Sequence, residues 1–174
     1  GRDTALVVSL LEMVNRTAVK SEVTSIRHAA ALLGQRELKK WINTVITKEL
    51  CADRPNEITR ISLLRAKFME CLALSFGLAM KTPELFLMGL FSVLDIILSM
   101  PMEEALNKVN ISKEIREALL HRSGEFADIY NFMTAYENAD WQEVSRIQIL
   151  KNIDNDAVFK AYIEAVCWYK EMFF

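Results

Sequence analysis

The sequence is poor in the residues that break helices or cross-link small folds. It contains 5 glycines, 3 prolines and 3 cysteines in 174 residues. Long elements with few turns are therefore expected, which favours an all-α fold over a turn-rich β-sandwich. Cys51, Cys71 and Cys167 are far apart and odd in number, which argues against a disulfide framework or a zinc knuckle. We expect a cytoplasmic protein with reduced thiols, in which Cys71 and Cys167 are small buried apolar residues.

The chain also lacks an excess of charge of either sign. Its 21 Lys and Arg residues stand against 23 Asp and Glu residues, which gives a formal net charge of -2. Such a balance provides no broad positive surface for nucleic acid or for an anionic membrane. The most apolar stretch, Leu85 to Met100, is shorter than the roughly 20 residues of a membrane span. The sequence therefore predicts neither a nucleic-acid partner nor a membrane segment.

Apolar residues are abundant and recur at helical spacing. They make up 52% of the chain, and no repeat or linker divides it, so we expect one domain over residues 1–174. One long helix is predicted from Glu57 to Phe76, stopped by Gly77. The stretch Leu85 to Met100 lacks a polar stripe, so it should form one central helix surrounded by the others. Further helices should begin after the capping residues Ser112, Asp140 and Asp154.

Asp95 lies inside the predicted central helix, where a carboxylate is costly unless it is paired. We expect it to face Arg65 or Lys67, and the alternative is that it lines a cleft.

Several residues are candidates for contacts with a partner. Arg36, Lys39 and Lys40 follow i, i+3, i+4 spacing, which suits an acidic partner or a nucleotide phosphate, or simply a solvated helix face. Trp141 directly follows the predicted cap, and we single it out as an exposed contact, with packing as the alternative. The first predicted helix has more apolar positions than one buried stripe requires, so Val8 is expected on an exposed surface that self-associates or is covered by a missing segment.

Two segments carry a family resemblance. The letters RD at 2–3, LLEMVN at 10–15 and SIRHA at 25–29 form the first, and FLMGLF at 86–91 is the second. They resemble the HDOD family, the HD-related output domains of bacterial signalling proteins. Stretches 64–70, 89–95, 100–104 and 140–141 are similar to the modified HD-GYP half of proteins that join it to an EAL domain. The resemblance implies that further N-terminal helices and an upstream EAL domain belong before residue 1.

The metal ligands of an active HD enzyme are missing at the matching positions. Such an enzyme uses an adjacent His-Asp pair to hold metals that activate a water. This chain has only His28 and His121, and it carries Ser92 and Val93 where the resemblance puts the pair. We therefore expect no catalytic residue, no metal and no cofactor, and a protein that is not an enzyme.

The resemblance implies a non-catalytic regulatory or protein-interaction output domain of a bacterial signal transduction protein related to cyclic di-GMP. Its partner would be another protein or the EAL domain of the same protein. Two alternatives stay open from the sequence. One is a residual metal-dependent phosphohydrolase, and the other is a structural helical module that forms a homo-oligomer.

Overall fold

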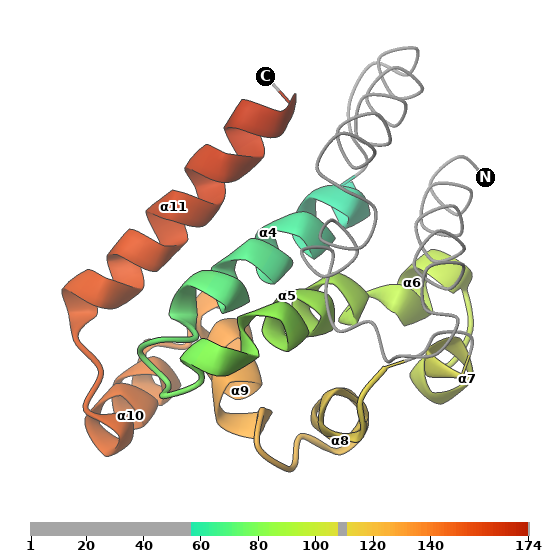
Figure 1. The fold of residues 1–174 in the computed structure, drawn as a ribbon, viewed down its shortest axis with the longest axis horizontal. Helices are drawn as coiled ribbons and strands as arrows, with labels where there is room; N and C mark the ends of the chain where they lie inside the picture. The colour runs from blue at the N-terminus through green and yellow to red at the C-terminus, as the bar shows by residue number, and fades with distance from the viewer. Residues whose placement is uncertain (1–56, 108–110, 174) are drawn as a thin grey trace.

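The computed structural model describes residues 57–107 and 111–173, and every regular element in this part of the chain is a helix (Figure 1). The all-α prediction is confirmed. The predicted contact residues Val8, Arg36, Lys39 and Lys40 lie outside the described residues. The elements, in chain order, are α4 (Glu57–Leu72), η1 (Ala79–Lys81), α5 (Thr82–Phe91), α6 (Leu94–Leu98), α7 (Met102–Leu106), α8 (Lys113–His121), α9 (Ala127–Glu137), α10 (Trp141–Lys151) and α11 (Asn155–Phe173).

Helices α4 and α5 lie against each other at the centre of the described region (Figure 1). They approach each other tightly at Gly89, where an added Cβ would lie 2.6 Å from the Cα of Ala66 and 2.7 Å from the carbonyl carbon of Arg65. Only a residue without a side chain fits such a crossing. The Ser62 hydroxyl strengthens it by donating to the Leu90 carbonyl at 2.7 Å.

Helix α4 ends at Leu72, four residues before the predicted end. The chain then turns, and the Leu78 amide donates back to the Ala73 carbonyl at 2.8 Å. Gly77 has a φ of 68°, which glycine adopts without strain, so it marks the reversal that the sequence indicated.

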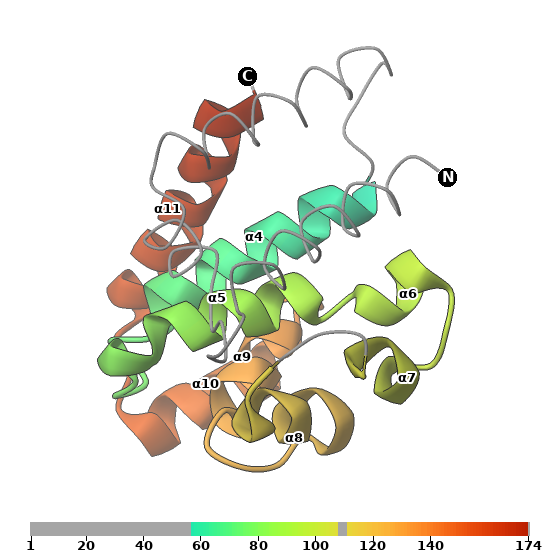
Figure 2. The same ribbon diagram turned by 45° about the vertical axis from the view of Figure 1, so that its right-hand side comes forward.

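The apolar stretch Leu85 to Met100 is not one helix, and this prediction is wrong. Helix α5 ends at Phe91, and α6 begins at Leu94. The Ser92 hydroxyl donates to the Gly89 carbonyl at 2.7 Å, a local side-chain bond of the kind that competes with helix continuation. Residues 85–91 of α5 are all buried, which confirms its central position. Figure 2 shows α6 beyond the end of α5, with α7 below it.

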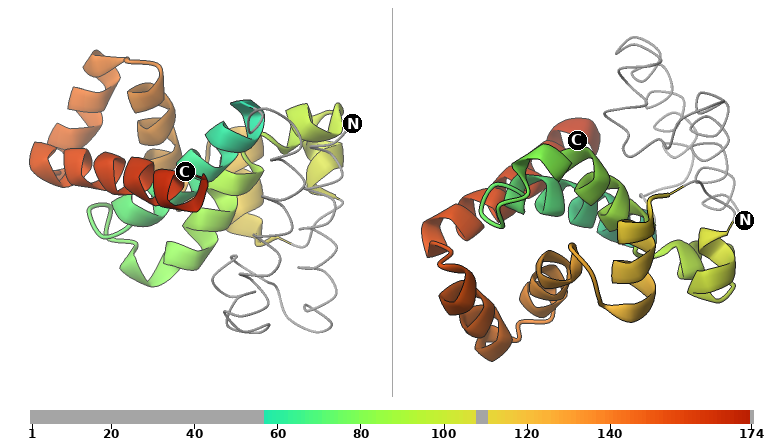
Figure 3. Two further views of the ribbon diagram at one scale, coloured as in Figure 1. Left: turned by 90° about the horizontal axis from the view of Figure 1, so that it is seen from above. Right: turned by 60° about the horizontal axis from the view of Figure 1, so that its bottom comes forward.

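The C-terminal helices begin at caps that the sequence predicted. The Ser112 hydroxyl accepts from the Ile115 amide at 3.3 Å, and the Asp140 carboxylate accepts from the Glu143 amide at 3.2 Å. Helix α11 starts directly after Asp154. It packs along α4, while α10 packs on α9. Figure 3 shows α10 and α11 running apart from the turn that joins them.

The two described cysteines differ in exposure. Cys71 is half-buried on α4, whereas Cys167 on α11 is exposed, so the prediction of a buried Cys167 is wrong. Helix α11 buries only the side that faces α4, and Cys167 lies away from it. Within the described ranges no helix is both long enough and apolar enough to cross a membrane.

Candidate functional site

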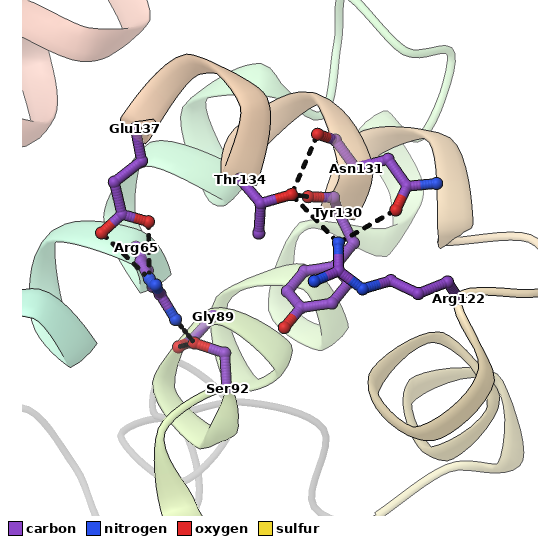
Figure 4. A network of polar contacts seen from close by, with 8 residues as sticks. All are labelled: Arg65, Gly89, Ser92, Arg122, Tyr130, Asn131, Thr134 and Glu137. Atoms are coloured by element: carbon purple, nitrogen blue, oxygen red, sulfur yellow. Dashed lines mark hydrogen bonds and ion pairs between the residues drawn. The ribbon is translucent and has the colours of Figure 1, made fainter. Parts of the chain in front are cut away.

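Ser92 and Val93 lie in the buried turn between α5 and α6. Ser92 donates its hydroxyl proton to the Gly89 carbonyl and accepts a hydrogen bond from Nη1 of Arg65 at 3.1 Å (Figure 4). Val93 contributes only apolar surface. A guanidinium group therefore contacts the serine where the family resemblance puts a metal-binding pair.

Arg65 connects three helices through this turn. Its Nε lies 2.9 Å from Oε2 of Glu137 on α9, while Nη1 reaches Ser92 after α5 (Figure 4). Lys67 instead pairs with Glu70 at 3.1 Å and lies over the Trp168 ring, 5.7 Å from its centroid.

The predicted pairing of Asp95 with Arg65 or Lys67 is wrong. Because the helix breaks at Ser92, Asp95 occupies the first turn of α6 and is only half-buried. A carboxylate in the first turn of a helix is stabilised by the positive end of the helix dipole.

A second polar network holds α8 against α9. The guanidinium of Arg122 lies 4.4 Å from the centroid of the Tyr130 ring and donates to Asn131 at 3.1 Å and to Thr134 at 3.0 Å (Figure 4). The Thr134 hydroxyl also donates to the carbonyl oxygens of Tyr130 and Asn131, so this network fixes the turn after α8. His121 precedes it and is exposed.

No three His, Cys, Asp or Glu side chains converge to hold a metal ion within 57–107 and 111–173. The expectations of no metal and no cofactor stay predictions, and elemental analysis of the purified protein checks the first.

Ser92→Ala should lower the free energy of unfolding by about 1 to 2 kcal/mol, because a buried hydroxyl with two partners is lost and Arg65 keeps an unfilled donor. Chemical denaturation measures the change. Ser145→Ala, at an exposed position of α10, is the matched control and should change little. Equal stabilities for the two variants would contradict the structural role of Ser92.

Trp141 lies at the start of α10 and is 56% exposed, as the predicted contact requires, and its role as a contact stays a prediction. Its ring meets that of Tyr136 edge-on, with centroids 5.5 Å apart. Both rings border a groove of about 390 Å³ between α4, α9 and α11, together with Tyr162 and the charged residues Arg60, Arg65 and Glu137. Tyr162 on α11 is 41% exposed, and its ring contacts that of Phe68 on α4 with centroids 5.7 Å apart.

Apart from the groove, large apolar side chains are exposed on α10 and α11, and sequence reasoning missed them. We call this surface the hairpin surface and define it by Ile149, Leu150, Phe159 and Ile163, each of which is exposed. Phe159 and Ile163 are four residues apart, outside the α4-facing stripe. This second stripe was the signal in the sequence that pointed to an exposed apolar face.

Cys71 should react far more slowly with thiol reagents than Cys167. Burial raises the pKa of the Cys71 thiol to about 12, and the negative charge of Glu164 adds to the shift. At pH 8 a thiol with that pKa is about one ten-thousandth thiolate, the reactive form. In a Cys51→Ser background, mass spectrometry after iodoacetamide treatment should find Cys167 modified first. Equal rates would show that Cys71 is not buried as described.

Two curated relatives match nearly the whole chain. The cyclic di-GMP phosphodiesterase CdgJ of Vibrio cholerae serotype O1 is 28% identical over 98% of the chain, and the uncharacterized protein YuxH of Bacillus subtilis is 28% identical over 96%. The chain spans only about 40% and 41% of their respective lengths. No solved structure matches.

The first of these relatives corrects the expectation that the protein is not an enzyme, because CdgJ is named a phosphodiesterase. The missing His-Asp pair concerns one site of one domain, and it does not decide whether a protein with this domain is an enzyme. The family is shown by the HDOD domain model, which matches residues 1–114 of the 174. The chain belongs to the HDOD domain family.

Proposed function

We propose that this chain is the regulatory, protein-binding domain of a bacterial cyclic di-GMP phosphodiesterase. The family and the name of the Vibrio cholerae relative support the signalling context. In this proposal the longer protein is cytoplasmic and carries an EAL domain that hydrolyses cyclic di-GMP, while the described helices form a modified HD-GYP domain that controls it. The relatives support a second domain, because the chain matches only about two fifths of their length.

The hairpin surface carries the protein-binding part of the proposal. Phe159 is 60% exposed and Ile149 is 79% exposed. Leu150, which follows Ile149, and Ile163, four residues after Phe159, are exposed as well. Large apolar side chains that stay exposed in this way occur at the interaction surfaces of soluble proteins. Fully covering Phe159 alone would add roughly 2 kcal/mol of hydrophobic stabilisation to a contact.

The partner we propose for this surface is the EAL domain of the same protein. Attachment to the same chain raises its effective concentration to the millimolar range for a short flexible linker, so a modest apolar surface is enough for a stable contact. A separate protein would have to bind without this advantage.

Carbene footprinting of the full-length protein tests the contact. Phe159 and Ile163 should be labelled much less than their exposure in the structure predicts, because the EAL domain covers them. Leu74 and Met80 provide the internal control, since they are 78% and 92% exposed and lie outside the hairpin surface. Labelling of all four residues in proportion to their exposure would overturn the proposed contact.

A further inference from the structure

The groove beside Trp141 has the size and lining of a small-molecule site. Its volume of about 390 Å³ lies within the range of ligand pockets, roughly 300 to 1,000 Å³. Most of its lining is apolar, and Arg60, Arg65 and Glu137 supply the charged groups. A pocket that combines apolar walls with a few convergent polar groups suits a ligand with both a flat apolar part and a charged part.

Three of the aromatic rings that line the groove lie side by side. Tyr136 lies between the other two, with its ring centroid 5.5 Å from that of Trp141 and 5.5 Å from that of Tyr162. The ring planes of Tyr136 and Trp141 cross at 87°, so Tyr136 meets Trp141 edge to face rather than stacked on it. Trp141 and Tyr162 are both partly exposed, which leaves ring surface for a planar ligand. Stacking of a nucleobase on such a ring contributes roughly 1 to 3 kcal/mol per base.

The charged groups of the groove differ in how firmly they are held. Arg65 is fixed by Glu137 and Ser92. Within the described part of the chain, Arg60 pairs with Glu57, and this ion pair is exposed, with side-chain exposures of 43% and 64%. Exposed ion pairs contribute little to stability, so Arg60 can exchange Glu57 for a phosphate at small cost.

The Glu137 carboxylate determines which nucleobase fits the groove. Its two oxygens lie 3.3 Å and 2.9 Å from the same atom, Nε of Arg65, and its side chain is 37% exposed. A carboxylate has about four acceptor positions, so lone pairs remain for a ligand. Guanine presents two adjacent N–H donors on its Watson–Crick edge, which one carboxylate accepts together, whereas adenine has no such pair.

We propose that the groove between α4, α9 and α11 binds a guanine nucleotide. The base lies against Trp141 and Tyr162, its donor edge meets Glu137, and its phosphate meets Arg60. The inference rests on the proposed function, which supplies cyclic di-GMP and its linear product as nucleotides of this class. The groove would then sense the substrate or the product of the phosphodiesterase at a site distinct from the hairpin surface.

Calorimetric titration of the chain with cyclic di-GMP, GMP and AMP tests the site. GMP should bind at least tenfold more tightly than AMP, and Glu137→Gln should remove most of this difference, because an amide accepts at only one oxygen. Trp141→Ala should weaken all three nucleotides at least tenfold. Arg60→Met should weaken GMP but leave guanosine unchanged, because only the phosphate contact is lost.

Ile149→Ala is the control, because this exposed residue does not line the groove, and it should leave every affinity unchanged. Thermal unfolding shows whether each variant is folded, and Tyr162→Ala replaces Trp141→Ala as the test of stacking if that variant is not. Equal affinity for GMP and AMP, absence of binding, or full affinity in folded Trp141→Ala would each overturn the assignment. These outcomes are separate from the footprinting result, which reports on Phe159 and Ile163 without nucleotide.

Discussion

Gly89→Val is expected to lower the free energy of unfolding by about 3 kcal/mol. The reason is the crossing of α4 and α5, where even a Cβ at position 89 would come within 2.6 Å of the Ala66 backbone. Backbone atoms cannot rotate away as a side-chain end can. The two central helices would have to separate, which opens the core on both sides.

Gly77→Ala is the matched control for this prediction. Gly77 has a φ of 68°, but nothing lies within 4 Å of the added Cβ. Gly77→Ala should therefore lower the free energy of unfolding by only about 1 kcal/mol, the strain of an alanine in the left-handed backbone conformation. Urea denaturation of both variants measures the difference, and a Gly89→Val variant as stable as Gly77→Ala would contradict the close crossing.

Leu94→Asp should abolish the cooperative unfolding transition. Leu94 is fully buried at the start of α6, and a carboxylate there would be buried without an opposite charge. The expected loss exceeds about 4 kcal/mol, which is a large part of the stability of a typical domain. Calorimetry and near-ultraviolet circular dichroism provide the measurement.

Ile96→Asp lies two residues further along the same helix and is the control. Ile96 is 55% exposed, so its replacement places the new charge in water. This variant should unfold cooperatively, close to the wild-type temperature. If Leu94→Asp behaves in the same way, the burial of α6 against the core is wrong.

The sequence predicted features that depend on local chemistry. Ser112 and Asp140 cap their helices as expected, because a cap needs only a side-chain oxygen near the next amides. Gly77 reverses the chain for a similar local reason. The all-α class followed from composition and periodicity, which are also local properties.

Predictions from the sequence were wrong where contacts between distant residues decide the structure. Apolarity alone could not show that the chain breaks at Ser92, where the hydroxyl bonds locally to Gly89 and Arg65 contacts it from another helix. The pairing of Arg65 with Glu137 joins residues 72 positions apart. No periodic pattern reports such a contact, and for this reason Asp95 was assigned the wrong partner.

We propose that the hairpin surface controls the hydrolysis of cyclic di-GMP by a longer protein that contains this chain. The most direct test is the turnover of cyclic di-GMP by the full-length protein, compared with its Phe159→Glu variant and with an Ile96→Glu control. Phe159 and Ile96 have similar exposures, 60% and 55%, but only Phe159 belongs to the hairpin surface. The account predicts that the wild type hydrolyses cyclic di-GMP, that Phe159→Glu changes kcat/KM at least fivefold, and that Ile96→Glu leaves it unchanged. No hydrolysis by the wild type, or the same kcat/KM in all three proteins, would contradict it.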